Sequence, residues 1–180
     1  MVYVLLGNGF EETEAVTPID LLRRAGIPVL TVGINGKIIY GSHGIGIEAD
    51  ITLEQMDLTH AQMLVLPGGL GGVASIRESR LAMDAIGFAR DNGILLAAIC
   101  AAPTILADLH ITDNKQATCY PGCEADMGAA LILPGEANVR DGNIITGTSA
   151  GCAISFGLAL IAALKGDAAA KTVENQFVIR

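Results

Sequence analysis

Cys100 is the residue whose type and position most clearly favour chemistry. It directly follows an apolar run at residues 94–99 and precedes a predicted helix at residues 102–109. This strand-to-helix position is the context of a nucleophile elbow. A thiol at a helix N-terminus faces unpaired backbone N–H groups and the positive end of the helix dipole, which lowers its pKa. The sequence therefore predicts a nucleophilic thiol at Cys100 and leaves a buried core cysteine as the alternative.

Three carboxyl groups follow the glycine-rich end of a first predicted strand. We interpret Glu11 and Glu12 as negative charges that complement the N-terminal dipole of a helix at residues 11–25. Glu14 is predicted to point from the first helical turn into a cleft. Burial there would keep its carboxyl protonated, so that it could donate a hydrogen bond to a thiolate.

Other polar groups offer weaker signals. The Pro67-Gly68-Gly69 segment after another strand could supply N–H donors to an oxyanion, or form a plain turn. Cys119 and Cys123 lack a second cysteine pair and so make a poor zinc site. Cys119 remains a candidate spare or resolving thiol in the pocket, and Cys152 is expected in the core or an interface.

The histidines do not complete a cysteine–histidine pair. His110 lies ten residues after Cys100, about 15 Å away if the segment is helical, which is too far to reach the thiol. His43 and His60 carry no motif and are interpreted as surface or loop residues. We predict no metal and no cofactor. No glycine-rich phosphate-binding pattern follows a strand.

The elements that would position these groups alternate between strands and helices. Strands are predicted at residues 2–6, 28–34, 37–40, 63–66, 94–99 and 143–146, and helices at 11–25, 73–91, 102–109 and 154–164. Hairpin turns are predicted at Asn35-Gly36 and Asp141-Gly142. This alternation favours a mostly parallel sheet with helices on both faces and strand 94–99 at its centre. Loops 7–14, 67–72 and 99–103 should then converge on one pocket beyond the carboxyl ends of the strands.

Composition limits the class of protein. The 180 residues fit one domain, and the 51% apolar content suits a sheet buried on both faces. The formal net charge of −8 disfavours a nucleic-acid partner. No apolar run reaches the length of a membrane span, and the N-terminus shows no leader pattern, so we expect a cytoplasmic protein.

Several segments together resemble one family. They are 9–14 (GFEETE) with 18–20 (PID), 66–69 (LPGG), 98–103 (AICAAP), 117–121 (ATCYP) and 156–164. This combination is similar to the ThiJ/PfpI superfamily, more narrowly to the branch that contains the Parkinson-disease-associated protein deglycase and bacterial YajL. The similarity covers nearly the whole chain, residues 1–180 as a single domain. It implies a flavodoxin-like three-layer sandwich with a nucleophile elbow, and a homodimer.

The resemblance also implies roles for individual residues. Cys100 would be the reactive cysteine and Glu14 its protonated partner, with oxyanion donors on the backbone of Gly69 and Cys100. We expect Gly68, Ala101 and Tyr120 to complete the oxyanion and substrate-binding site. Tyr120 stands where the branch often has a histidine, and 146–151 (TGTSAG) stands where the branch commonly shows Ser-Arg-Gly-Pro-Gly.

The implied activity is a glutathione-independent glyoxalase or a protein deglycase. Its substrate would be a small carbonyl compound, a 2-oxoaldehyde such as methylglyoxal or its adducts, captured as a covalent hemithioacetal on Cys100. The alternative is an oxidation-sensing or chaperone-like stress protein with little turnover. A role in thiamine metabolism is suggested only by the historical name of the family.

Overall fold

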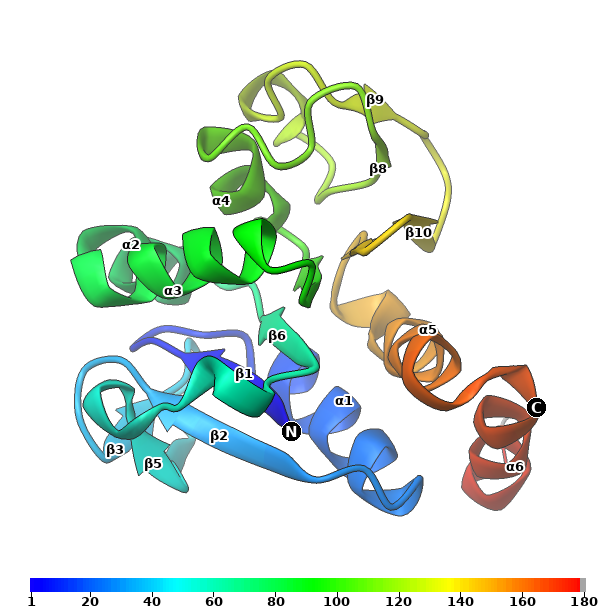
Figure 1. Ribbon diagram of the computed structural model, residues 1–180, viewed down its shortest axis with the longest axis horizontal. Coiled ribbons are helices and arrows are strands. Elements are labelled where there is room, and N and C mark those ends of the chain that lie inside the picture. The colour runs from blue at the N-terminus through cyan, green and yellow to red at the C-terminus, as the bar shows by residue number, and fades with distance from the viewer. Residues whose placement is uncertain (179–180) are drawn as a thin grey trace.

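A seven-stranded sheet forms the centre of the computed structural model, which describes residues 1–178 (Figure 1). Its strands in spatial order are β10 (Asn138–Asp141), β11 (Ile144–Gly147), β7 (Leu95–Ile99), β6 (Met63–Leu66), β1 (Val2–Leu6), β2 (Val29–Gly33) and β5 (Ile51–Thr52). All neighbouring pairs are parallel except β10 with β11, which are joined by the predicted turn at Asp141-Gly142. Four parallel strands, β1, β6, β7 and β11, therefore end side by side at one edge of the sheet.

Helices cover both faces of this sheet. They are α1 (Glu12–Arg24), α2 (Leu70–Glu78), α3 (Arg80–Asp91), α4 (Pro103–Asp108), α5 (Ala153–Lys165) and α6 (Asp167–Phe177). Alternate side chains of β1 point to opposite faces, so that Val2 and Val4 pack against α1 and α5 while Tyr3 and Leu5 pack on the side of α2, α3 and α4. Figure 1 shows these two groups of helices on opposite sides of the strands. The predicted three-layer α/β sandwich is confirmed.

Two expected elements differ from the structure. The Asn35-Gly36 turn does not form a hairpin, because β2 pairs in parallel with β1 and β5, while β3 (Ile38–Tyr40) pairs with β4 (Gly46–Glu48). The Asn35 side chain instead accepts a hydrogen bond from the Asn8 N–H at 2.9 Å. The helix predicted at 73–91 is two helices, because Ser79 interrupts it and caps α3 by accepting from the Ala82 N–H at 3.3 Å.

Smaller elements lie outside the sequence-based expectations. These are α6, β4, β5, the short pair β8 (Gln116–Ala117) and β9 (Leu131–Ile132), and the 3-10 turns Leu53–Gln55, Leu58–His60, Glu124–Asp126 and Ala150–Cys152. Strand β7 is an interior strand as expected, although β6 holds the middle position. Within residues 1–178, none of the helices combines the length and apolar character that a bilayer span requires.

Candidate active site

Cys100 sits on a strained elbow between β7 and α4. Its φ of +67° lies in the left-handed region, which non-glycine residues occupy at an energetic cost. Two backbone hydrogen bonds hold it there. The Cys100 N–H donates to the Gly147 carbonyl at 2.9 Å, and the Cys100 carbonyl accepts from the Tyr120 N–H at 2.8 Å. The thiol is thus fixed by segments about 20 and 47 residues further along the chain.

A cavity of about 520 Å³ opens beside this thiol. Its lining residues are Glu11, Glu14, Gly69, Leu70, Cys100, Ala101, Tyr120, Cys123, Ser149, Ala150 and Gly151. The three loops expected to converge do so, at the carboxyl ends of β1, β6 and β7. Two further segments, around Tyr120 and at residues 149–151, complete the wall.

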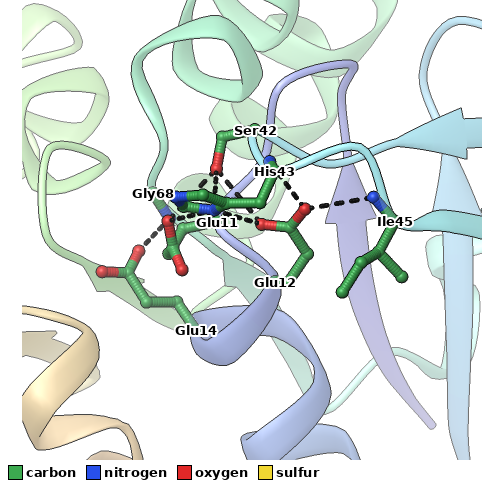
Figure 2. Close-up of polar contacts among 7 residues, drawn as sticks. All are labelled: Glu11, Glu12, Glu14, Ser42, His43, Ile45 and Gly68. Carbon is green, nitrogen blue, oxygen red and sulfur yellow. Dashed lines mark hydrogen bonds and ion pairs between the residues drawn. The ribbon is translucent and has the colours of Figure 1, made fainter.

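Glu14 projects from the first turn of α1 to the bottom of this cavity and is only 1% exposed. Its Oε2 accepts a hydrogen bond from the Gly68 N–H at 2.9 Å (Figure 2). Burial raises the pKa of the Glu14 carboxyl to about 7, although hydrogen bonds with the Cys100 thiol, the Gly68 N–H and the Ala150 backbone act in the opposite direction. The carboxyl therefore changes its protonation state near neutral pH.

The expected lowering of the thiol pKa is wrong for this geometry. Burial, followed by the charge of the adjacent Glu14 carboxylate, raises the pKa of Cys100 to about 12. Helix α4 begins only at Pro103 and has six residues, so its N-terminal field does not offset these two effects. Each anion disfavours the other, and the pair holds one proton over the range between these two pKa values.

Two backbone N–H groups face the sulfur of Cys100. Hydrogen bonds from the Ala101 and Gly69 backbones favour its ionised form. The expectation that the Cys100 N–H acts as an oxyanion donor is wrong, because that group already donates to Gly147. The available pair of donors is therefore Gly69 and Ala101, while the N–H of Gly68 is engaged with Glu14.

Gly68 lies directly behind the Cys100–Glu14 pair. A Cβ added to this residue would approach Glu14 Oε2 to 2.5 Å, Cys100 Cβ to 2.6 Å and the Ile99 carbonyl to 3.0 Å. No side chain fits there without displacing one of these groups. Gly68 thus allows the thiol and the carboxyl to meet.

Tyr120 and the remaining cysteines occupy distinct places. Tyr120 is 49% exposed and lines the cavity with Cys123. Cys119, the candidate pocket thiol, is instead buried with Ala117 and Met127 under the β8–β9 segment. Cys152 is half-buried at the start of α5 and is not among the lining residues.

Sequence reasoning missed part of the cavity wall. Residues 149–151 fall within the segment that departs from the family pattern, and that departure was the available signal. Leu70 lies within loop 67–72, which was expected at the pocket, whereas Cys123 carried no pattern that could have assigned it. The place of Cys123 depends on how the loop after α4 returns over the sheet edge.

Glu12 and His43 form a second polar cluster next to the cavity (Figure 2). Glu12 is 7% exposed, and its carboxylate accepts hydrogen bonds from the Ser42 hydroxyl at 3.1 Å and from His43 N–H and Nδ1 at 2.8 and 3.0 Å. The Ile45 N–H donates to it at 3.4 Å. Glu12 therefore does more than complement a helix dipole. The side chain of His43 is 70% exposed, yet its contact with Glu12 connects the β3–β4 segment to α1.

The Glu12 cluster favours an ionised Glu12 and a protonated His43. Burial opposes ionisation of Glu12, yet the hydrogen bonds from His43 and from backbone N–H groups hold its pKa at about 2. The hydrogen bond with Glu12, helped by the charges of Glu11 and Glu12, raises the pKa of His43. Ligand atoms of Glu11, Glu12 and His43 lie within 4.8 Å of one another, a spacing that hydrogen bonds of this kind already explain.

Comparisons with known proteins identify related chains. A model of the DJ-1/PfpI family matches residues 1–163. The chain is 35% identical over 178 residues to "Protein dj-1beta" of Drosophila melanogaster, covering 98% of this chain and 95% of that protein. It is 31% identical over 149 residues to "Deglycase PH1704" of Pyrococcus horikoshii, covering 81% and 87%.

Solved structures give the same result. The crystal structure of Drosophila melanogaster DJ-1beta superposes with a TM-score of 0.94 at 34% identity, over 99% of this chain and 97% of that one. Oxidized Toxoplasma gondii DJ-1 superposes with a TM-score of 0.92 at 29% identity, over 98% and 97%. The similarity thus includes both the sheet and the loops that form the cavity.

Proposed function

The chain belongs to the DJ-1/PfpI family, and on that premise we propose that it is a cysteine-dependent enzyme of the glyoxalase and deglycase type. Its substrate is a 2-oxoaldehyde such as methylglyoxal, or an adduct of one. The observation that carries the proposal is the buried Cys100–Glu14 pair, with the N–H groups of Gly69 and Ala101 directed at the sulfur.

The first step is addition of the thiol to the aldehyde. Cys100 Sγ forms a bond to the aldehyde carbon as its proton passes to the Glu14 carboxylate, and the carbonyl π electrons move to oxygen. The N–H groups of Gly69 and Ala101 stabilise that oxyanion. Glu14 then returns the proton to the oxygen, which gives a neutral hemithioacetal and restores the carboxylate.

The second step moves a proton between neighbouring carbons. The Glu14 carboxylate removes the proton from C1 of the hemithioacetal, which leaves an enediolate with its negative charge on O2, and Glu14 then delivers the same proton to C2. Transfer of the O1 proton to O2 forms the C1 carbonyl and the C2 hydroxyl, which gives a neutral thioester of the 2-hydroxy acid and restores the Glu14 carboxylate. Water hydrolyses this thioester, which releases the hydroxy acid and regenerates the Cys100 thiol. A carboxyl pKa near 7 suits a group that both accepts and donates a proton.

The direct test is consumption of methylglyoxal without glutathione. We expect Cys100→Ser to lower turnover by at least about a thousandfold, since it removes the nucleophile. Cys152→Ser is the matched control, because that thiol lies outside the cavity lining, and it should keep turnover within twofold of the unmodified chain. Full turnover by Cys100→Ser would refute the covalent mechanism.

A second candidate function is oxidation sensing at the same thiol. The supporting observation is that Glu14 and the N–H groups of Gly69 and Ala101 surround Cys100 Sγ, where they would hydrogen-bond the oxygens of a sulfinate. Mild peroxide should then add two oxygen atoms to Cys100 in preference to Cys119, Cys123 and Cys152. Peptide mass spectrometry locates the added mass, and uniform oxidation of all four cysteines would exclude this function.

The proposal also covers the domain organisation, the location and the oligomeric state of the protein. We propose that residues 1–180 act as one ThiJ/PfpI domain, that the protein is a cytoplasmic homodimer, and that its reaction uses no cofactor or metal. Chaperone-like activity in oxidative stress accompanies the second candidate. Light scattering after size-exclusion chromatography tests the dimer directly.

A further inference from the structure

The charge lining the cavity is negative. Glu11 and Glu14 both contribute to the wall, and no lysine, arginine or histidine is among the lining residues of the described chain. His43, whose pKa is raised by Glu12 and Glu11, lies 3.6 Å from Glu11 Oε2 but is not part of the lining. A ligand that enters the cavity therefore meets one or two carboxylates and no cationic side chain to receive an anion.

Glu11 is the carboxylate that no proposed step uses, and it is firmly positioned. Its backbone N–H donates to the Gly68 carbonyl at 3.0 Å, and its Oε2 lies 3.2 Å from the Ser42 hydroxyl, whose one proton it shares with Glu12. His43 Nδ1 lies 3.6 Å from the same oxygen, at the outer side of the cluster. The Glu11 side chain keeps 20% of its surface exposed. It is thus fixed while still accessible from the cavity.

The field of Glu11 reaches the reacting groups. Its negative charge is one of the causes that raise the pKa of Glu14, which in turn lies against the Cys100 thiol. On its inner side the cavity is bounded by the buried residues Glu14 and Ala101, and buried surroundings of this kind weaken a charge less than bulk water does. A charge on a bound reagent beside Cys100 is therefore within reach of Glu11.

Tyr120 also favours a positively charged ligand. Its ring lines the cavity, and the face of an aromatic ring attracts cations. A carboxylate and an aromatic ring together form a surface that suits a positively charged group. Neither stabilises a carboxylate.

We propose that Glu11 is a specificity-determining residue that admits neutral and cationic carbonyl compounds to Cys100 and rejects anionic ones such as 2-oxo acids. The identity of the substrates as carbonyl compounds rests on the proposed function, whereas the selection by charge applies to any reagent of Cys100. The hydroxy acid formed in the proposed reaction is an anion, and the same charge favours its release.

Alkylation of Cys100 tests the selection without requiring turnover. Iodoacetamide, iodoacetate and 2-bromoethylammonium are neutral, anionic and cationic reagents of similar size. Rates of modification of the Cys100 peptide, each divided by the rate with free glutathione, should favour iodoacetamide over iodoacetate by about tenfold, or about 1.4 kcal/mol. The cationic reagent should react at least as fast as the neutral one, and 0.5 M NaCl should reduce all differences.

The variant Glu11→Gln assigns the effect to one side chain. We expect it to reduce the preference from about tenfold to threefold or less, because only the Glu14 charge remains. Glu136→Gln, an exposed carboxylate outside the cavity lining, is the matched control and should leave the preference unchanged. Equal normalised rates for the three reagents in the unmodified protein, or an unchanged preference in Glu11→Gln, would overturn the proposal.

Substrate pairs separate this inference from the proposed function. Phenylglyoxal should be consumed faster than 4-carboxyphenylglyoxal by a ratio that Glu11→Gln lowers. Charge-selective alkylation without turnover of either compound would refute the enzymatic function and support the charge selection. Turnover of both compounds at equal rates would refute the selection and support the enzyme.

Discussion

Glu12 and Glu14 lie two residues apart in the first turn of α1, are both buried, and yet differ widely in acidity. The pKa of Glu12 is lowered to about 2, while that of Glu14 is raised to about 7. Glu12 accepts hydrogen bonds from Ser42, His43 and Ile45, including two backbone N–H groups. Glu14 faces a cavity, and its hydrogen-bond partners are the neutral Cys100 thiol and the backbone of Gly68, at 2.9 Å, and of Ala150.

The comparison shows that burial alone does not decide what a carboxyl does. Burial raises the pKa of both groups, and the number and charge of the donors determine the outcome. Glu12 remains a permanent anion that holds the β3–β4 segment. Glu14 can accept and return a proton near neutral pH, which is the property that catalysis requires.

The largest expected effect is that of Glu14→Gln on turnover. A neutral amide keeps the shape of the side chain but cannot accept the Cys100 proton, so methylglyoxal consumption should fall by about 10²–10⁴-fold. The amide oxygen can still accept from the Gly68 N–H, so the fold should persist, as measured by circular dichroism. Turnover within tenfold of the unmodified chain would contradict the role of Glu14 as the proton carrier.

Gly68→Ala should give the next largest effect. The new Cβ would approach Glu14 Oε2 to 2.5 Å and Cys100 Cβ to 2.6 Å, which forces the pair apart. A displacement of about 1 Å should lower turnover by roughly a hundredfold. Gly87→Ala in α3 is the matched control, since a Cβ there meets nothing within 4 Å, and its turnover should match that of the unmodified chain.

Glu12→Gln should affect stability instead of catalysis. Loss of the charged acceptor should lower the free energy of unfolding by roughly 2 kcal/mol, because several donors lose a charged partner. Urea denaturation measures this change, and turnover at saturating substrate should stay within about fivefold. A large loss of turnover with unchanged stability would show that Glu12 also takes part in the reaction.

The smallest expected effects are opposite slopes of stability with pH. The folded pKa of Glu12 is below its ordinary value of 4.5, so its stabilising contribution is present above pH 4.5 and is lost as the pH falls toward 2. The folded pKa of Glu14 is above its ordinary value of 4.5, so its contribution is favourable below pH 4.5 and is lost as the pH rises through about 7.

Urea midpoints measured between pH 3 and 8 would resolve these slopes. Glu12→Gln should flatten the acidic side, and Glu14→Gln should flatten the side between pH 4.5 and 7. The same slope in both variants would show that the two carboxyls do not differ in the way described.

Sequence reasoning recovered the elements whose patterns are local. Neighbouring residues encode the apolar runs of β1, β6 and β7 and the turn at Asp141-Gly142. They also encode the position of Cys100 at the elbow between a strand and a helix. The pairing of β3 with β4 was missed because an Asn-Gly turn does not specify the strand with which the following strand pairs. The break at Ser79 was missed because apolar residues continue on both sides of the helix cap.

The raised pKa of Glu14 agrees with the burial expected from the sequence, but the acidity of Cys100 could not be predicted from local sequence. Whether Cys100 has a raised or lowered pKa depends on the distance to Glu14, which is 86 positions away in the chain. The role of His43 likewise depends on a contact with Glu12 across 31 positions. Such contacts follow from the packing of whole elements.

The two backbone hydrogen bonds of Cys100 also bear on how the protein is synthesised. One joins the elbow to Tyr120 and the other to Gly147, and the Glu14 carboxyl bonds to the backbone of Ala150. A nascent chain that has left the ribosome only as far as residue 140 therefore contains both Cys100 and Glu14 but lacks two of these contacts. The thiol acquires its fixed geometry only when the residues through Ala150 have emerged, so a shorter nascent chain carries Cys100 and Glu14 without the contacts that hold them in place.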